Sequence, residues 1–527
     1  MAEEDILERI LADRARDLER LGPTFGCSVP QERTRPLVPF LAVPGAILEI
    51  KRASPSRGAI APGLDPAGLA ASYSASGARN VSVLTEMNHF SGSLDDLMAS
   101  ASACPQVAFL RKDFITLLEE VEVSYRAGAD ALLLIARILD GQTLHGLVAA
   151  CLSYGLRPFI EVRSGGDVQK LIPFAGDKRV LYGVNARDLA SFRIDALVPA
   201  GLRELLPGQA VYESGIHTPG AAAYARGLGY EGILVGESVA RNPVLASSLV
   251  SAFENAQPDA RGRFWRTIAT RLASRRSGRH RSGGPASGQG PGPGKDGSRR
   301  PLVKICGITC AEDGLAAAGL GADLLGFVFA DSPRAASEMA VRETRVALEE
   351  SASHSDIDGT SLPPLLVGVV TELQSPLARS AIRLARLGLL DTVQYHGHTG
   401  PGIMADLDSA LAGCEAGRYM VVNAGSAEDL DALDALLRDG EPRVLVDARV
   451  QGTAGGTGKL VPEAVLESAA GRGGLWLAGG LGPGTVGGIM DRYHPELVDA
   501  SSLLESGKGR KDPAKLEAFF KEIAAHV

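Results

Sequence analysis

The sequence predicts an α/β protein built from two tandem (β/α)8 barrels joined by a flexible basic linker. At 527 residues, 45% of them hydrophobic, the chain is too long for one ordinary domain and too apolar to be disordered. Each half contains eight short apolar or β-branched runs separated by helical stretches, a pattern typical of βαβ units around a parallel sheet. Between Ser274 and Arg300 the hydrophobic periodicity disappears, and Gly, Ser, Pro and Arg take over.

The chain opens with the amphipathic stretch Ile6–Leu21, which predicts a helix that packs across the first barrel. Its periodic apolar residues are Ile6, Ile10, Leu11 and Leu18. The eight predicted strands of the first half follow at 46–51, 80–84, 107–112, 131–135, 157–161, 180–184, 210–213 and 232–235. Those of the second half lie at 301–305, 323–328, 365–370, 391–395, 418–422, 443–447, 474–478 and 496–499.

Eight repeats in each half favour a closed barrel over an open, doubly wound sheet, which stays as the alternative. We expect a first domain at residues 1–255 and a second at 301–527. Residues 256–300 are expected to form the linker, disordered from about 274. A polar insert, Glu349 to Pro363, predicts a surface loop within the second barrel.

Composition narrows the class of protein. A net charge of −8 and a pI near 5.7 predict no general attraction to nucleic acid or to membranes. The acidic N-terminus and the lack of any apolar run of about 20 residues predict neither a signal peptide nor a membrane span. Six scattered cysteines indicate a reducing compartment, and Cys306 and Cys310 have no second ligand pair for zinc. We therefore expect a cytoplasmic protein.

Polar residues gather where the strands of the first half end, and in barrel enzymes the reacting groups lie there. Lys51, Lys112, Glu161 and Glu213 end the first, third, fifth and seventh strands, and Asn185 follows the sixth. One such residue is more often a simple salt-bridge partner. Five on one rim require mutual neutralisation or a charged ligand, which indicates an acid–base site.

Burial and a second nearby cation both lower the pKa of a lysine, which makes it a usable proton donor near neutral pH. We expect Lys51 and Lys112 to affect each other in this way. A carboxylate whose pKa is raised by burial then takes the complementary role of base.

Small residues follow three strands of the first half, and their backbone N–H groups or hydroxyls suit a phosphate. They are Ser54-Pro55-Ser56, Ser214-Gly215 and Gly236-Glu237-Ser238. Such glycines are weak evidence alone, because turns need glycine too.

Several segments, taken in order, resemble indole-3-glycerol phosphate synthase: Glu49–Ser56, Leu84–Glu86, Lys112–Phe114, Asn185–Leu189 and Glu213–Ile216. The resemblance implies a (β/α)8, or TIM, barrel. It also implies conversion of 1-(2-carboxyphenylamino)-1-deoxyribulose 5-phosphate to indole-3-glycerol phosphate, with release of carbon dioxide and water. This carboxy-lyase chemistry calls for no metal or organic cofactor.

The same resemblance implies roles for individual residues. Lys112 is expected to be the general acid at the substrate ketone and Glu161 the base in the dehydration. Lys51 is expected to pair with the anthranilate carboxylate and Glu49 to orient Lys51. The pocket is expected to be shaped by Asn185, Arg187, Glu213 and Ser214. The phosphate end is expected to be lined by Ser54, Gly215, Gly236 and Glu237.

In the second half, Cys306 comes directly after the first strand and Asp447 ends the sixth. A thiol acts as a base or nucleophile only as thiolate, with an ordinary pKa near 8.5. A lone buried cysteine is more often inert. The segments around this pair resemble phosphoribosylanthranilate isomerase: 304–309, 326–329, 332–334, 394–397, 455–458, 478–481 and 499–502.

That resemblance implies an intramolecular oxidoreductase that performs an Amadori rearrangement of N-(5-phosphoribosyl)anthranilate. Asp447 is expected to protonate the furanose oxygen and Cys306 to remove the C2 proton. Arg334 is expected to hold the anthranilate carboxylate, because a guanidinium binds a planar carboxylate with two hydrogen bonds. Gln394 and His396 are further expected substrate contacts. Phosphate is expected at Gly479, Gly480, Ser501 and Ser502, under a mobile loop at Gly455–Gly458.

Both halves depart from their families at a few positions. In the first half, Ala186 stands where a second Asn is usual, and Tyr212 stands where a smaller residue is common. In the second half, Tyr395 replaces a usual Leu, Ala500 replaces a usual Val, and Leu503–Leu504 replace Gly-Val. None of these changes removes a proposed catalytic group.

The hypothesis is a bifunctional enzyme of tryptophan biosynthesis whose C-terminal barrel makes the substrate of the N-terminal barrel. We expect phosphorylated anthranilate derivatives as substrates, no nucleic-acid or membrane partner, and a monomer or homodimer. Three alternatives stay open: another phosphate-binding barrel such as a sugar isomerase, an RNA-binding scaffold that uses the arginine-rich linker, and a pair in which one barrel is inactive.

Overall fold

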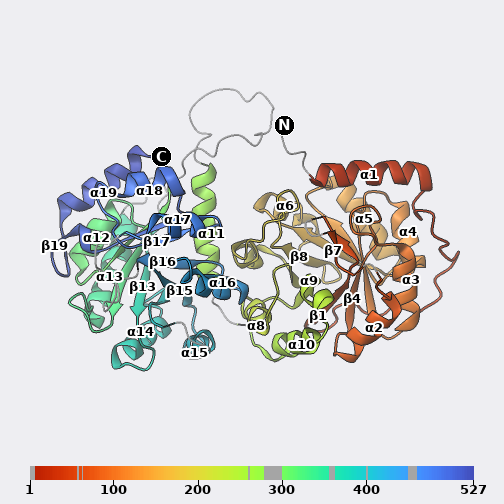
Figure 1. Cartoon of the computed structure of the whole chain (residues 1–527), viewed down its shortest axis with the longest axis horizontal. Helices are drawn as coiled ribbons and strands as arrows, with labels where there is room; N and C mark the ends of the chain where they lie inside the picture. The colour runs from red at the N-terminus through yellow and green to blue at the C-terminus, as the bar shows by residue number, and fades with distance from the viewer. Residues whose placement is uncertain are drawn as a thin grey trace. The chain divides into compact units, whose positions relative to one another are not determined.

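Two closed eight-stranded barrels make up the computed structural model (Figure 1), which describes residues 6–55, 58–61, 63–258, 262–277, 300–354, 362–398, 402–448 and 460–527. Each barrel belongs to its own compact unit, and the chain passes from one unit to the other near residue 258. All barrel strands pair in parallel, so the predicted tandem (β/α)8 fold is confirmed and the open sheet is excluded. Residues 278–299 of the predicted linker lie outside the described residues.

The first barrel closes in the strand order β1-β10-β9-β8-β7-β6-β5-β4. Each predicted run of the first half forms one strand, with bounds shifted by at most two residues. The strands are β1 (Gly45–Ile50), β4 (Asn80–Leu84), β5 (Ala108–Lys112), β6 (Ala131–Ile135), β7 (Arg157–Val162), β8 (Leu181–Asn185), β9 (Ala210–Glu213) and β10 (Gly232–Val235). A short antiparallel hairpin, β2 (Ala53–Ser54) and β3 (Gly58–Ala59), follows β1.

Helix α1 (Ile6–Leu21) has the predicted bounds and lies on the first barrel, where Leu7 and Ile10 join the apolar core (Figure 1). Its buried side also carries two charged residues, Arg14 and Asp17, which the apolar periodicity does not reveal. The other helices of this unit are α2 (Pro66–Ala75), α3 (Leu94–Ala103), α4 (Glu119–Arg126), α5 (Gly141–Ser153), α6 (Gly165–Gln169), α7 (Leu197–Leu202), α8 (Pro219–Gly227), α9 (Glu237–Arg241) and α10 (Leu245–Asn255).

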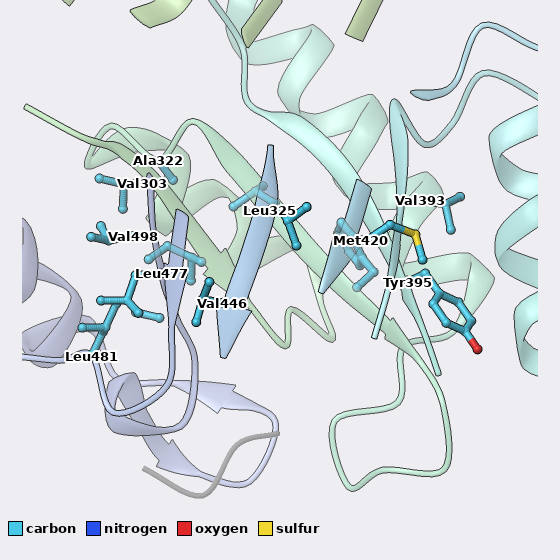
Figure 2. Close-up of a cluster of buried hydrophobic side chains, with 14 of the residues drawn as sticks. Val303, Ala322, Leu325, Val393, Tyr395, Met420, Val446, Leu477, Leu481 and Val498 are labelled. Carbon is cyan, nitrogen blue, oxygen red and sulfur yellow. The ribbon is translucent and has the colours of Figure 1, made fainter. Parts of the chain in front are cut away.

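The strands of the second barrel follow one another in chain order, and β18 pairs with β11 to close the sheet. They are β11 (Leu302–Cys306), β12 (Leu324–Phe329), β13 (Leu365–Val370), β14 (Thr392–Tyr395), β15 (Gly417–Ala424), β16 (Val444–Ala448), β17 (Trp476–Ala478) and β18 (Leu497–Ala500). Figure 2 shows part of the buried apolar cluster of this unit, including Val303, Met420 and Val498. A hairpin of β19 (Glu505–Gly507) and β20 (Arg510–Lys511) follows β18.

Helix α11 (Gly262–Ser277) lies within the segment predicted to be linker, and it packs on the second barrel. The ring of Phe264 stacks on Tyr419 with centroids 6.0 Å apart, and Trp265 lies 5.8 Å from Trp476. Arg275 donates to both carboxylate oxygens of Asp323 at 2.6 and 2.7 Å. The prediction that residues 256–300 form a linker is therefore wrong over 262–277, where the arginines of the helix hide the pattern of its apolar face.

The remaining helices of the second unit are α12 (Ala311–Gly319), α13 (Glu338–His354), α14 (Pro376–Arg386), α15 (Ile403–Ala410), α16 (Leu430–Arg438), α17 (Glu463–Ala470), α18 (Val486–Tyr493) and α19 (Pro513–Ala525). Since α13 runs to His354, the predicted insert loop at 349–363 begins as helix, and residues 355–361 lie outside the described part. In the parts of the chain that the structure describes, no helix is long and apolar enough to cross a membrane.

Candidate active sites at the mouths of the two barrels

The carboxyl ends of the first barrel's strands surround an open cavity of about 920 Å³. All five rim residues singled out in the sequence line it: Lys51, Lys112, Glu161, Asn185 and Glu213. They come from five different strands or the residues directly after them, so it is closure of the barrel that brings them together.

Lys112 is the last residue of β5, and its ammonium lies between two carboxyl groups. Nζ is 2.8 Å from Oε2 of Glu213 and 3.5 Å from Oε2 of Glu161. Burial alone would lower the pKa of Lys112, but Glu213, Glu161 and Glu49 outweigh it and raise that pKa above its ordinary value. The expectation of a lowered pKa is therefore wrong, because carboxylates surround this lysine.

Glu213 is the closer partner of Lys112, and its side chain is almost fully buried. Burial raises the pKa of Glu213 to about 8, with Lys112 opposing the shift and Glu161 adding to it. A carboxyl group with this pKa retains its proton at neutral pH. A protonated acid therefore flanks the Lys112 ammonium together with Glu161.

A second lysine–glutamate pair lies on β1 and the residue after it. Nζ of Lys51 is 2.8 Å from Oε1 of Glu49. Burial opposes ionisation of Glu49, but Lys51 and Lys112 outweigh burial and lower its pKa. Gly236 is needed beside this pair, since a Cβ there would lie 2.3 Å from Oε1 of Glu49.

Residues after β8 and β9 form another part of the wall. Oδ1 of Asn185 accepts hydrogen bonds from the Ser214 hydroxyl at 2.9 Å and from the Arg187 backbone N–H at 3.0 Å. Arg187 in turn lies 3.4 Å from Oε2 of Glu237. Ser214 and Gly215 both have positive φ, of 68° and 81°, which turns the backbone sharply beneath the cavity. Ser54 also lines the cavity, so all eight residues expected in the pocket are present at it.

Apolar side chains complete the cavity, and no role was predicted for any of them from the sequence. They include Phe90, Phe114, Leu133, Leu189 and Phe192. An aromatic ring fits such a lining because burial of apolar surface favours its binding. For Phe114, the sequence did contain a signal, because this residue follows Lys112 by two positions and so lies just beyond the end of a strand.

Asp113 links the site to α1. Its Oδ1 accepts from Nε of Arg14 at 2.8 Å, and its Oδ2 accepts from Arg111 at 3.0 Å and from the Thr85 hydroxyl at 2.6 Å. Burial opposes ionisation of Asp113, but Arg14 and Arg111 outweigh it and lower the pKa. The residue next to Lys112 is thus held by a helix 99 positions away in the sequence.

At the mouth of the second barrel, Asp447 on β16 faces His396, which follows β14. Nε2 of His396 lies 3.4 Å from Oδ2 of Asp447 and 2.9 Å from Oδ1 of Asn423. Burial raises the pKa of Asp447 despite the opposing effect of His396. Asp447 therefore keeps its proton to higher pH than an exposed aspartate, as a general acid requires.

Cys306 ends β11, and burial raises the pKa of its thiol while Lys304 opposes the shift. The guanidinium of Arg334 donates two hydrogen bonds to Glu505, at 2.7 and 3.0 Å. Arg334, which is expected to hold a substrate carboxylate, is thus paired with a carboxylate of the protein in this structure. Gln394 is buried, and its side-chain oxygen accepts from Lys304 and Tyr419, both at 2.7 Å.

The residues expected to hold phosphate in the second barrel follow β17 and β18. Gly479 and Gly480 have φ of 88° and 63°, and a Cβ on Gly479 would lie 2.7 Å from Oδ1 of Asp447. The Ser501 hydroxyl donates to the backbone oxygen of Cys306 at 3.0 Å, and Ser502 begins the short helix η4 (Ser502–Leu504). The predicted loop at Gly455–Gly458 lies outside the described residues.

Comparison with known proteins matches the two halves of the chain to two different families. Residues 7–250 match the family model of indole-3-glycerol phosphate synthase, and residues 303–522 match that of N-(5'-phosphoribosyl)anthranilate isomerase. The indole-3-glycerol phosphate synthase of Dehalococcoides mccartyi is 35% identical over 258 residues, covering 46% of this chain and 98% of that protein.

Two relatives match most of the chain. A multifunctional tryptophan biosynthesis protein of Schizosaccharomyces pombe is 29% identical over 566 residues, covering 99% of this chain. The chain spans 66% of the length of that relative. A tryptophan biosynthesis protein of Phytophthora nicotianae is 29% identical over 516 residues. The match covers 88% of this chain and 88% of that protein.

Proposed function

Since the chain belongs to the indole-3-glycerol phosphate synthase family over residues 7–250 and to the phosphoribosylanthranilate isomerase family over residues 303–522, we propose that it catalyses two consecutive steps of tryptophan biosynthesis. The second barrel isomerises N-(5-phosphoribosyl)anthranilate to 1-(2-carboxyphenylamino)-1-deoxyribulose 5-phosphate. The first barrel closes the indole ring on that product, with loss of carbon dioxide and water.

The observation that carries the proposal is the cavity of the first barrel, where an ammonium lies between two carboxyl groups beside an apolar wall. Ring closure needs a proton donor at the ketone oxygen while the aromatic carbon is held close to the carbonyl carbon. Lys112 is the donor in this proposal, and Glu161 removes the proton in the later dehydration. Glu213 holds Nζ of Lys112 in place.

The substrate's two anionic ends need separate partners in the same cavity. Lys51, oriented by the Glu49 carboxylate, pairs with the anthranilate carboxylate. The phosphate is held by the Ser54 hydroxyl and by backbone N–H groups at Gly215, Gly236 and Glu237. Glu237 contributes only through its backbone, because its carboxylate repels phosphate and pairs with Arg187.

In the second barrel, protonated Asp447 delivers its proton to the furanose oxygen, and the ring opens to an imine. The Cys306 thiolate then removes the C2 proton, which gives the enolamine that tautomerises to the ketone product. Arg334 receives the anthranilate carboxylate in exchange for Glu505, with His396 beside the acid. The phosphate is held by N–H groups of Gly479, Gly480, Ser501 and Ser502. Gln394 is a further residue of this site, and its side-chain oxygen accepts a hydrogen bond from Lys304.

We also propose that the protein works in the cytoplasm as a monomer or homodimer, with no nucleic-acid or membrane partner. All six cysteines are free, which suits a reducing compartment. Sedimentation equilibrium measures the mass directly, and a species larger than a dimer would rule out the proposed assembly.

The two activities can be separated by one substitution in each barrel. In an indole-fluorescence assay with each intermediate supplied in turn, Lys112→Ala should lose ring closure by about 100-fold or more and keep isomerisation. Cys306→Ala should show the opposite pattern. Lys178→Ala and Cys414→Ala, on exposed or remote side chains, serve as matched controls that keep both activities. Loss of both activities in either site variant, or of neither, would contradict the assignment.

A further inference from the structure

A buried lysine lies beneath Cys306 on the same strand. Lys304 precedes Cys306 by two positions on β11, and side chains two apart on a strand point to the same face, here the barrel interior. A Cβ on Gly326 of β12 would lie 2.7 Å from Sγ of Cys306 and 3.1 Å from Cε of Lys304. The thiol and the lysine side chain therefore pass side by side over one glycine.

The ammonium of Lys304 is fully buried and is held by two acceptors. It forms an ion pair with Asp499, its register partner on β18, and donates to Oε1 of Gln394 at 2.7 Å. The hydroxyl of Tyr419 donates to the same oxygen at 2.7 Å, which holds the Gln394 side chain in place. An ammonium has three N–H groups, and both the Cys306 thiol and the Tyr419 hydroxyl lie within reach of Lys304.

Charges from several elements act on Cys306. Lys304 on its own strand and Lys511 on β20 favour the thiolate, and Nζ of Lys511 donates to the Cys306 backbone oxygen at 2.6 Å. Asp499 on β18 and burial oppose the thiolate. The further titratable groups of the interior are Tyr419 on β15, Asp447 on β16 with His396, and Glu505 paired with Lys511. Lys304 is the strongest of the charges that favour ionisation of the thiol.

We propose that Lys304 is a positioning residue whose buried ammonium stabilises the Cys306 thiolate, and that Asp499 holds this ammonium and limits its effect on the sulfur. Lys304 has no exposed surface, so in this proposal it acts through Cys306. The inference rests on the proposed role of Cys306 as the base of the isomerase. The buried ammonium limits how far burial raises the pKa of this thiol, and so favours the thiolate that proton abstraction needs.

The test measures the thiol itself rather than the enzyme reaction. The rate of Cys306 alkylation by iodoacetamide is followed against pH in the full chain, with the modified peptide quantified by mass spectrometry. Lys304→Met should move the midpoint upward by about one pH unit or more, because a neighbouring cation is lost. Asp499→Asn should move the midpoint downward, because the opposing carboxylate is lost. A purely structural role of the pair predicts no such opposite shifts.

Controls keep the test decisive if one variant folds poorly. The double variant Lys304→Met/Asp499→Leu leaves no unpaired buried charge, so it should retain the native circular dichroism and give a midpoint between those of the single variants. Alkylation of Cys310 in the same samples should be unchanged. Unchanged Cys306 midpoints, or shifts in the same direction for both single variants, overturn the proposal. Opposite midpoint shifts without a matching shift in the pH profile of isomerisation support it and refute Cys306 as the base.

Discussion

Lys112 and Lys304 are two lysines on barrel strands, both paired with carboxylates, and both have a pKa raised above the ordinary value despite burial. They differ in depth. Lys112 ends its strand and is 16% exposed at the cavity, whereas Lys304 lies two residues before the end of its strand and is 0% exposed. Two residues of a strand span about 7 Å. In the proposed roles, that distance separates a lysine that meets the substrate, Lys112, from one that acts on a neighbouring side chain, Lys304.

The carboxyl groups around the two lysines differ as well. Lys112 has two close acid partners, of which Glu213 keeps its proton at neutral pH. Lys304 has one close acid partner, Asp499, and its ammonium also donates a hydrogen bond to the amide oxygen of Gln394. These partners suit the proposed roles, proton transfer for Lys112 at the rim and a fixed charge for the buried Lys304.

The largest difference between the lysines should appear in stability. Lys304→Met leaves Asp499 buried without a counter-charge, so the second unit should lose about 3–5 kcal/mol of unfolding free energy. Lys112→Met removes a cation that is 16% exposed, and Glu213 beside it keeps its proton and needs no counter-charge, so the first unit should lose less, about 1–3 kcal/mol. Differential scanning calorimetry of the full chain measures both losses. Equal losses in the two variants would remove the distinction drawn from depth.

The next effect separates the charge of Lys112 from its proton. Lys112→Arg keeps a cation beside Glu213 and Glu161, but a guanidinium does not give up a proton in proteins. Ring closure should therefore fall by about 100-fold or more while the unfolding free energy stays within about 1 kcal/mol. Steady-state kinetics of ring closure provide the measurement.

Lys51→Arg is the matched control for this substitution. Arginine still pairs with a carboxylate, so this variant should keep more activity than Lys112→Arg. Comparable loss in both variants would mean that shape rather than proton transfer limits the reaction.

The smallest effect concerns the proton on Glu213. Its pKa is about 8 in the folded chain against an ordinary 4.5, so between these pH values the native state binds a proton that the unfolded state releases. The unfolding free energy of the first unit should fall as pH rises through this window, by at most a few kcal/mol because the titration is shared with Lys112 and Glu161. Glu213→Gln does not titrate and should flatten this dependence in denaturant titrations at pH 5 and pH 8. An identical slope in the variant would contradict the raised pKa.

The sequence predicted which polar residues lie at the carboxyl ends of barrel strands. This was possible because a strand is recognised from the pattern of neighbouring residues, and reacting groups in barrel enzymes follow the strand ends. Lys112, Glu161 and Glu213 were found in this way. Contacts between distant segments could not be read. Arg14 reaches Asp113 across 99 positions, and Arg334 reaches Glu505 across 171.

The predicted direction of the Lys112 pKa shift was wrong because that shift, too, depends on contacts between distant segments. It depends on how close three carboxyl groups come to Nζ when the barrel closes, and spacing along the chain does not contain that distance. Helix α11 was missed because its arginines resemble linker charge, while its apolar residues become informative only against Tyr419 and Trp476.

The aromatic contact of α11 has a practical consequence for spectroscopy. The chain has two tryptophans, Trp265 and Trp476, and both belong to the second unit and are fully buried. Intrinsic tryptophan emission of the whole protein is therefore a selective reporter of the second barrel and of α11 docking on it, while the first barrel is silent at that wavelength. One cuvette can follow the denaturation of one half of the molecule without separating it from the other.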